Sequence, residues 1–165
     1  MKQISNRGST LIEILLAVAI LAIALCAILG AYISCFVLMA TSKNINIATN
    51  VALGLMEDIR SAPFTDLSGA DLVINNQPFE QLSTHLYRCR FSVGVLPTNK
   101  IVVYMNDTNP DLLELTISIC WRQGGRVIGE DTDLDGVLDA GEDKSSPPNG
   151  IIDSPVELVT RIANR

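Results

Sequence analysis

The densest concentration of chemically active side chains is a run of carboxylates in the last quarter of the chain. Five acidic residues fall within the twelve positions from Asp131 to Glu142. A tight loop with this spacing aims its oxygens at one centre, and Ca²⁺ takes about six to eight such ligands. Gly136 occupies the sixth position, where the loop must turn sharply. The predicted metal ligands are the carboxylates of Asp131, Asp133, Asp135, Asp139 and Glu142 and the backbone carbonyl of Val137.

This loop also resembles calcium loops of known families. Seven of its positions match the EF-hand pattern, but the sequence predicts no long helices beside it. The loop is therefore more similar to the isolated calcium loops of dockerins and thrombospondin-type repeats. The resemblance implies that Ca²⁺ is the bound ion. The alternative interpretation is a solvated acidic loop, which is the usual outcome for a run of charge.

A partial copy of the loop follows it in the chain. The segment from Asn149 to Asp153 repeats positions five to nine of the pattern, with Gly150 at the turn. The connecting segment Ser145–Pro148 contains no carboxylate that could supply the earlier ligands. Asn149 and Asp153 are therefore expected either to complete the first site or to form part of a second.

The acidic character of the chain belongs to this region alone. Residues 130–153 carry eight acids and one base, whereas the remainder carries ten acids and eleven bases. The net charge of −6 excludes a basic nucleic-acid-binding surface, and no nucleic-acid partner is expected. The clustered carboxylates are better explained as ligands than as catalysts. The only histidine, His85, has no partner at catalytic or metal-ligand spacing and is expected at the surface, so the chain is not expected to be an enzyme.

The other end of the chain contains a long apolar run. Residues 14–39 include no charge and no proline, and about 20 such residues suffice for a transmembrane helix. Lys2 and Arg7 precede the run, which predicts a cytoplasmic N-terminus and a single pass. A cleaved secretory signal is the alternative, but its apolar region is usually only about 7–15 residues long. A lipoprotein signal at Cys26 or Cys35 is a further alternative.

The residues just before this run resemble the processing site of type IV prepilins. The matching motif is Arg7-Gly8-Ser9-Thr10-Leu11-Ile12-Glu13. The resemblance implies that a prepilin peptidase removes residues 1–8 by cutting between Gly8 and Ser9, and that it methylates the new N-terminus. It also implies that Glu13 faces the α-amino group of a neighbouring subunit during assembly. The chain departs from the family at Ser9, where a phenylalanine is usual.

The helix is expected to extend beyond the membrane. After the assembly helix of residues 9–39, apolar residues recur at spacings of three and four through residues 40–62, which predicts an amphipathic helix ending before Pro63. This stripe consists of Ile45, Ala48, Ala52, Leu55, Met56 and Ile59. The remaining residues, 63–165, are expected to form a globular β head.

Alternating or β-branched stretches predict the strands of that head. They are residues 87–95, 101–105, 113–121 and 156–162, and the last is expected to pair with residues 119–127 and to leave the acidic segment at the hairpin tip. The fold class is α+β: a long N-terminal helix packed on a small antiparallel sheet, as in pilins. Cys89 falls on the apolar face and Cys120 on the polar face, so they form a disulfide only if a bulge brings them together.

The resemblance as a whole implies a minor type IV pilin or pseudopilin with a calcium-stabilised head. Its partners would be the prepilin peptidase, other subunits contacted through the N-terminal helix, and the bacterial inner membrane. The head would lie in the periplasm or outside the cell, in a pilus or in a type II secretion pseudopilus. The alternative is an uncleaved, membrane-anchored calcium-binding module that does not polymerise.

Overall fold

The structure is a computed structural model that describes residues 11–62, 64–67 and 73–164. Gly8 and Ser9, the predicted processing residues, lie outside the described residues. The chain divides into two compact units, residues 1–42 and 43–165. The elements are α1 (Leu11–Ser61), α2 (Phe64–Leu67), β1 (Val73–Ile74), β2 (Gln77–Pro78), β3 (Glu80–Ser83), β4 (Leu86–Phe91), β5 (Asn99–Asn109), β6 (Leu112–Gln123), β7 (Arg126–Ile128) and β8 (Glu157–Ala163).

Helix α1 is continuous over 51 residues, and its first part is apolar on every side. The large apolar side chains from Leu11 to Met39 are exposed within their unit. This helix is long and apolar enough to cross a membrane, a property that anchors and N-terminal signal sequences share. Glu13 lies in the first turn of α1 and is exposed. The described part of the first unit therefore consists of helix alone, with a single acidic side chain.

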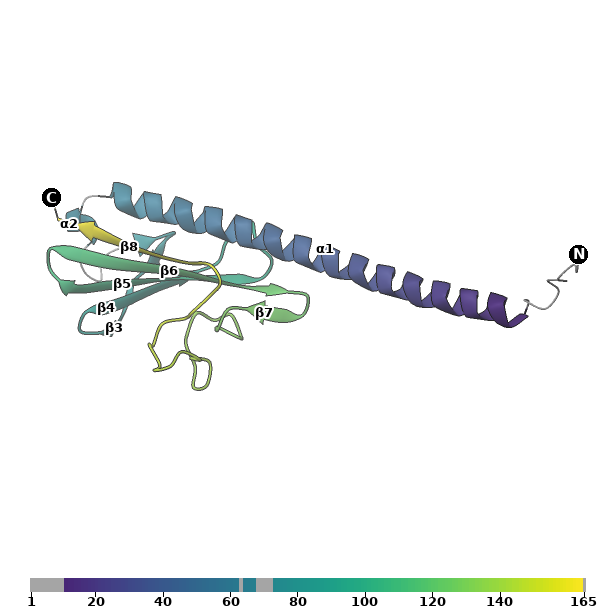
Figure 1. The fold of residues 1–165 in the computed structure, drawn as a ribbon. Helices are drawn as coiled ribbons and strands as arrows, with labels where there is room; N and C mark the ends of the chain where they lie inside the picture. Colours follow the sequence, from purple (N-terminus) through teal and green to yellow (C-terminus); the bar gives the residue numbers. More distant parts are fainter. Residues whose placement is uncertain (1–10, 63, 68–72, 165) are drawn as a thin grey trace, which may run out of the picture. The chain divides into compact units, whose positions relative to one another are not determined.

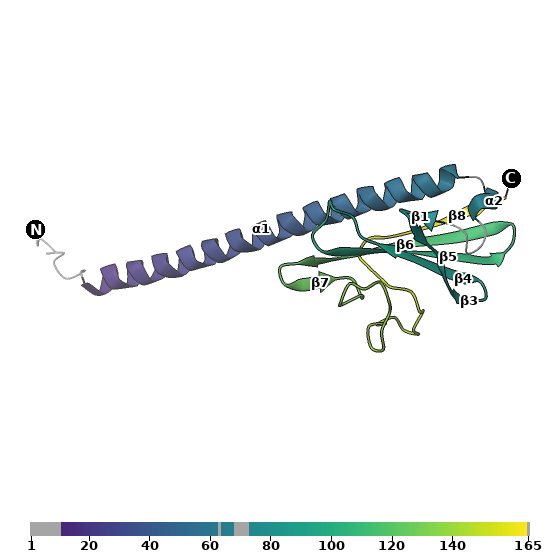
Figure 2. The ribbon, with the colours of Figure 1, turned by 180° about the vertical axis from the view of Figure 1, so that it is seen from behind.

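The second part of α1 belongs to the head, where it packs on the sheet (Figures 1 and 2). Ala48, Ala52 and Ile59 are buried. Ile45, Leu55 and Met56 are partly buried and pack against the same core, so the predicted apolar stripe is confirmed. The stripe is buried because spacings of three and four keep its members on one face of the helix.

The head is built on a six-stranded antiparallel sheet in which β3, β4, β5 and β6 are consecutive neighbours. Strands β7 and β8 both lie on the far edge of β6. Strand β7 pairs with residues 121–123 of β6, and β8 pairs with residues 112–118. The α+β class is thus confirmed, with a further two-stranded sheet formed by β1 and β2. The sequence did not predict β1, β2 or β3.

The predicted pairing of the last strand was wrong. Gly124 and Gly125 both have positive φ angles, +57° and +84°, and turn the chain back immediately after β6. The sequence predicts residues 156–162 at this position on the β6 edge, but the structure places strand β7 there. Strand β8 pairs with the first half of β6 instead. The acidic segment, residues 130–153, is the connection between β7 and β8 rather than the tip of a hairpin.

Alternation along β5 and β6 places two separate hydrophobic cores on the two faces of the sheet. The inner core lies beneath α1 and includes Ile101, Val103, Ile117, Ile119 and Trp121. The outer core consists of Val102, Tyr104, Cys120, Leu134 and Ile152. Figures 1 and 2 show the acidic segment on the side of the sheet opposite α1. Both faces of the sheet are therefore covered, one by the helix and the other by the acidic segment.

Candidate metal centre

The acidic segment is closed at its base by Glu130, which precedes the predicted ligands. Its backbone N–H donates to the carbonyl of Asp153 at 3.0 Å. Its carboxylate accepts the N–H of Lys144 at 2.9 Å and that of Asp153 at 3.3 Å. Glu130 therefore joins the two ends and the middle of a segment more than twenty residues long. Sequence reasoning missed this role, because the residue lies one position before the recognisable pattern.

Asp131 is the most deeply placed of the predicted ligands, with no exposed surface. Its Oδ1 accepts the backbone N–H of Asp135 at 3.2 Å, and its Oδ2 accepts that of Gly136 at 2.8 Å. Burial raises the pKa of this carboxyl group, and the backbone hydrogen bonds oppose that rise. The first position of the loop thus organises the backbone of the fifth and sixth.

Glu142 closes the loop from its other end. Its Oε1 accepts the backbone N–H of Thr132 at 2.8 Å and the Thr132 hydroxyl, and its Oε2 accepts the N–H of Asp139 at 3.0 Å. The hydrogen bond from the Thr132 hydroxyl is the main reason why the pKa of Glu142 is lowered. Carboxylate oxygens of Asp131, Asp133 and Glu142 lie within 4.8 Å of one another. This group of three could hold a metal ion.

The other predicted ligands surround this group without joining it. Asp135 is exposed, and its Oδ1 accepts the N–H of Val137 at 2.6 Å. Asp139 is also exposed, and Val137 is half-buried. The structure therefore brings three of the five predicted carboxylates together.

Gly136 is required at the turn for two reasons. Its φ angle is +83°, which disfavours any residue with a Cβ. A Cβ would also lie 3.0 Å from side-chain carbons of Arg90 and 3.1 Å from one of Lys100. Arg90 Nη1 donates to the carbonyl of Asp135 at 3.2 Å, which fixes the turn against β4. The sequence predicted the turn, and the structure adds the close packing against two basic side chains.

The partial copy of the loop is more complete than its sequence indicated. Oδ2 of Asp143 accepts the N–H of Gly150 at 3.0 Å, as Asp131 does for Gly136 in the first loop. The Asn149 Oδ1 accepts the N–H of Ile151 at 2.8 Å, the same contact that Asp135 makes with Val137. In the second loop, a longer stretch of chain separates Asp143 from Asn149 than separates Asp131 from Asp135 in the first. The spacing of the first loop therefore does not predict a role for Asp143.

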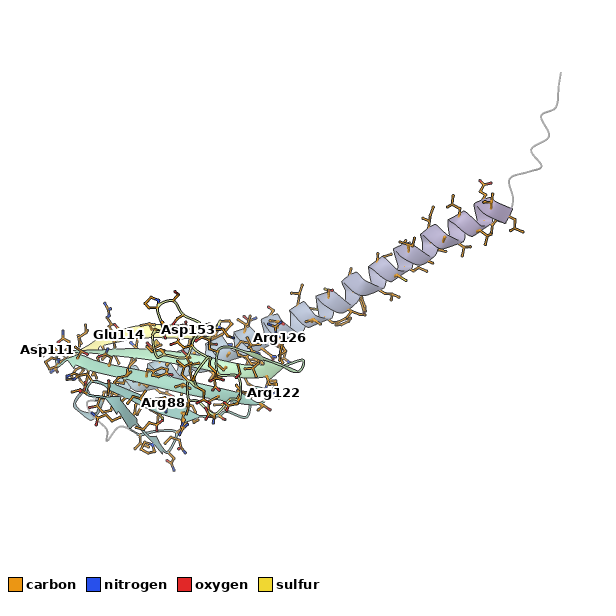
Figure 3. The ribbon with its side chains drawn as sticks, turned by 90° about the horizontal axis from the view of Figure 1, so that it is seen from below. Arg88, Asp111, Glu114, Arg122, Arg126 and Asp153 are labelled. Carbon is orange, nitrogen blue, oxygen red and sulfur yellow. The ribbon has the colours of Figure 1, made fainter. Side chains whose placement is uncertain are left out.

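Asn149 and Asp153 contact each other rather than the group of three. The Asn149 amide donates to Asp153 Oδ1 at 3.3 Å. Asp153 is not one of the carboxylates that lie within 4.8 Å of one another in the first loop. Figure 3 shows Asp153 near the sheet and Asp111 at the far end of the β strands. A role for Asn149 and Asp153, either in the first site or in a second one, stays a prediction.

The remaining candidate residues are two cysteines and a histidine that lie outside the acidic segment. Cys89 and Cys120 are both free and buried, and they belong to the inner and outer cores on opposite faces of the sheet. Burial raises the pKa of each thiol to about 11. His85 is exposed, as expected, but its Nδ1 lies 2.9 Å from Asp107 Oδ1. The sequence missed this partner because the β4–β5 pairing creates it across 22 positions of the chain.

Comparison of the chain with family models, with curated proteins and with solved structures gives no match. The interpretation of this site therefore depends on its own residues and their geometry.

Proposed function

We propose that this chain is a membrane-anchored structural subunit of the type IV pilin and pseudopilin class, with a head stabilised by Ca²⁺. The observation that carries the proposal is the division of α1 within one continuous helix. Its first part is apolar on all sides, and its second part is buried along one stripe only. A subunit that leaves the membrane and assembles by helix packing requires this combination. Both a pilus and a type II secretion pseudopilus are built from such subunits.

Assembly would depend on Glu13 and on the processed N-terminus. A carboxylate in an otherwise apolar stretch of helix is costly in a membrane unless a partner offsets its charge. The free α-amino group of a neighbouring subunit is that partner in our proposal, and a low dielectric strengthens the attraction. The pairing would set the axial position of each incoming subunit.

The acidic loop would bind one Ca²⁺ through Asp131, Asp133 and Glu142. Among the described residues, the acidic members of the ion pairs are Glu80, Asp107 and Glu114, and none lies in the loop. Asp131 is nevertheless fully buried, and a buried charge normally has a partner of opposite sign. A divalent cation would supply that charge, with Asp135, Asp139 and the Val137 carbonyl as further oxygen ligands.

Mass spectrometry of the mature N-terminus tests the subunit assignment. Co-expression with a prepilin peptidase should convert the chain to one beginning at Ser9, with or without a methyl group. Replacement of Gly8 by leucine should leave Met1 in place and so serves as the matched control. An intact Met1 in the wild-type chain would instead support the alternative, an uncleaved membrane-anchored calcium-binding module.

Thermal unfolding tests the calcium site separately. The free energy of unfolding should rise by about 2.7 kcal/mol when free Ca²⁺ reaches about 100 times its dissociation constant. Asp131→Asn should abolish this rise because it removes the most buried ligand. Asp111→Asn makes the same charge change at the β5–β6 turn and should retain the rise (Figure 3). Equal responses of the two variants to Ca²⁺ would remove the site from the proposal.

A further inference from the structure

The acidic segment covers a core that is separate from the main core of the head. Leu134 and Ile152 of the segment pack with Val102, Tyr104 and Cys120 on the outer face of the sheet. The inner core is formed on the opposite face with residues of α1 and includes Cys89. Removing the segment from the sheet would therefore expose one core and leave the contacts of the other in place.

The outer core, which holds the segment on the sheet, is much smaller than the inner core. Arg90 donates to the carbonyl of Asp135, and the Tyr104 hydroxyl accepts the N–H of Ile152 at 3.1 Å. Leu134 and Ile152, together with the partly buried Leu138 and Ile151, supply the apolar contacts. Regions with few buried apolar contacts open locally at a lower free energy than the global unfolding of the protein.

The outer face of the sheet also contains a buried hydroxyl group that favours opening of the segment. Ser118 pairs with Val102 of the outer core, so both side chains lie on the outer face. The Ser118 hydroxyl is buried and, within the part of the chain that the structure describes, has no hydrogen-bond partner. A buried hydroxyl without a partner recovers its hydrogen bonds with water when the cover opens, which favours opening.

The chain crosses between the two faces next to Cys120. Ile152 belongs to the outer core, whereas Val156, four residues later, belongs to the inner core. Between them, the Ser154 hydroxyl donates to the carbonyl of Ile119, and the N–H of Ile119 donates to the carbonyl of Val156 at 3.1 Å. These contacts tie the chain to the edge of β6, so that opening of the segment can stop there.

We propose that the acidic segment is a calcium-controlled cover, which opens to expose the outer core around Cys120 while the inner core around Cys89 stays closed. This inference rests on the proposed Ca²⁺ site of the loop. Ca²⁺ bound to Asp131, Asp133 and Glu142 holds the cover shut, because it fixes the loop that places Leu134 in the outer core. Removal of Ca²⁺ leaves their negative charges in place without the cation between them.

The two buried cysteines allow the opening to be measured with an internal control. The experiment uses the full chain in detergent, with Cys26 and Cys35 replaced by alanine, and a thiol-specific reagent. Cys89 and Cys120 are both buried, and each has an exposed fraction of only 1%. Chelation of Ca²⁺ should speed the labelling of Cys120 about 100-fold, compared with the rate in a solution whose free Ca²⁺ concentration is about 100 times the dissociation constant. Labelling of Cys89 requires global unfolding, whose free energy also falls on chelation, so Cys89 should react much more slowly than Cys120 both with and without Ca²⁺.

A second variant tests the cover without changing the metal ligands. Ile152→Ala removes an apolar contact of the outer core and should speed the labelling of Cys120 even with Ca²⁺ present, while Cys120 still reacts faster than Cys89. Val159→Ala is the matched control, because this β-branched residue of β8 is 56% exposed. It should leave both labelling rates unchanged.

The outcomes separate the cover from the cation site. Equal labelling rates of Cys89 and Cys120, with and without Ca²⁺, would show that Cys120 is exposed only by global unfolding and would overturn the inference. Calcium binding by calorimetry without any change in the labelling of Cys120 would overturn the cover and leave the proposed Ca²⁺ site intact. An effect of Ile152→Ala on Cys120 with no effect of chelation and no calcium binding would overturn the role of Ca²⁺ and the proposed site together.

Discussion

Asp131 and Glu142 show how the surroundings of two carboxylates in one loop set opposite properties. Burial raises the pKa of Asp131, so its negative charge is costly in the folded protein. The hydrogen bonds from Thr132 lower the pKa of Glu142, so its charge is already favoured. The loop therefore combines one preorganised carboxylate with one whose charge needs a partner.

Glu157, at the start of β8, allows a test of this electrostatic reasoning outside the candidate site. Burial, and then the charge of Asp153, raise the pKa of Glu157 above its usual value of 4.5. The ionised group is therefore less favourable in the folded than in the unfolded chain. Its unfavourable contribution is absent below pH 4.5 and develops as the pH rises through the raised pKa. Glu157→Gln should thus increase the free energy of unfolding slightly at neutral pH, with no increase below pH 4.5.

Urea denaturation across this pH range measures the effect. Glu114→Gln is the control, because Glu114 Oε2 pairs with Arg161 Nε at 2.7 Å on the same sheet. Loss of this exposed pair should cost between zero and about 1 kcal/mol at neutral pH. The same direction of change in both variants would contradict the argument.

Gly129, at the end of β7, makes a second prediction at the scale of one residue. Its φ angle is +116°, and a Cβ there would overlap the sulfur of Cys120. Gly129→Ala should lower the free energy of unfolding by about 1–3 kcal/mol through backbone strain, with a further loss from the overlap. Gly124→Ala, at φ +57° with open space around it, should show the backbone cost alone.

The double variant Gly129→Ala, Cys120→Ala separates these two contributions. Removal of the sulfur should restore part of the stability lost by Gly129→Ala, as measured by urea denaturation in a double-mutant cycle. Strictly additive losses would show that Gly129 does not need to be small because of Cys120.

At the scale of elements, small residues on α1 determine how closely the helix approaches the sheet. Ala48 and Ala52 have no exposed surface, whereas Ile45, Leu55 and Met56 are only partly buried. Trp121 and Ile119 of β6 belong to the same core and are also fully buried. Bulky side chains on the sheet are thus matched by alanines on the helix, which allows close packing.

Ala52→Leu should disturb this packing. The added side-chain atoms have no space between α1 and the inner face of the sheet, so the free energy of unfolding should fall by about 1–3 kcal/mol. Asn50→Leu introduces the same side chain at an exposed position of α1 and should change stability by less than about 0.5 kcal/mol. Chemical denaturation of the full chain in detergent measures both. Equal losses would show that the close packing of Ala52 against the sheet is not responsible.

At the scale of the whole molecule, the two units have different sources of stability. The described part of residues 1–42 is helix with exposed apolar side chains, which need an apolar environment. Residues 43–165 have their own cores on both faces of a sheet. Processing and assembly belong to the first unit in our proposal, and calcium binding belongs to the second. Variants in one unit should therefore leave the function of the other unchanged.

Glu13→Ala tests this separation. We expect normal removal of the leader and normal calcium binding, but weaker incorporation into filaments, because the partner of the neighbouring α-amino group is lost. Glu57→Ala removes an exposed acidic residue from the same helix within the head and should leave incorporation unchanged. Quantification of each variant in sheared filaments from cells that supply the other subunits measures the effect. Full incorporation of Glu13→Ala would contradict the proposed role.

The features that could be predicted from the sequence are those that depend on the periodicity or spacing of neighbouring residues. The stripe on α1 follows from spacings of three and four, and the alternation along β6 follows from the strand period of two. The group formed by Asp131, Asp133 and Glu142 follows from positions within one short loop. These patterns are local, so burial of one face was sufficient to decide them.

Only the tertiary structure decided how distant segments share the surfaces of the sheet. The turn at Gly124 and Gly125 gave one part of the β6 edge to β7, so β8 had to pair with the other part. Glu130 closes the acidic segment, and Asp143 takes the position of Asp131 in a loop with an insertion. Cys89 and Cys120 belong to different cores because the sheet separates them. Each of these outcomes depends on contacts between residues far apart in the chain, which no local period specifies.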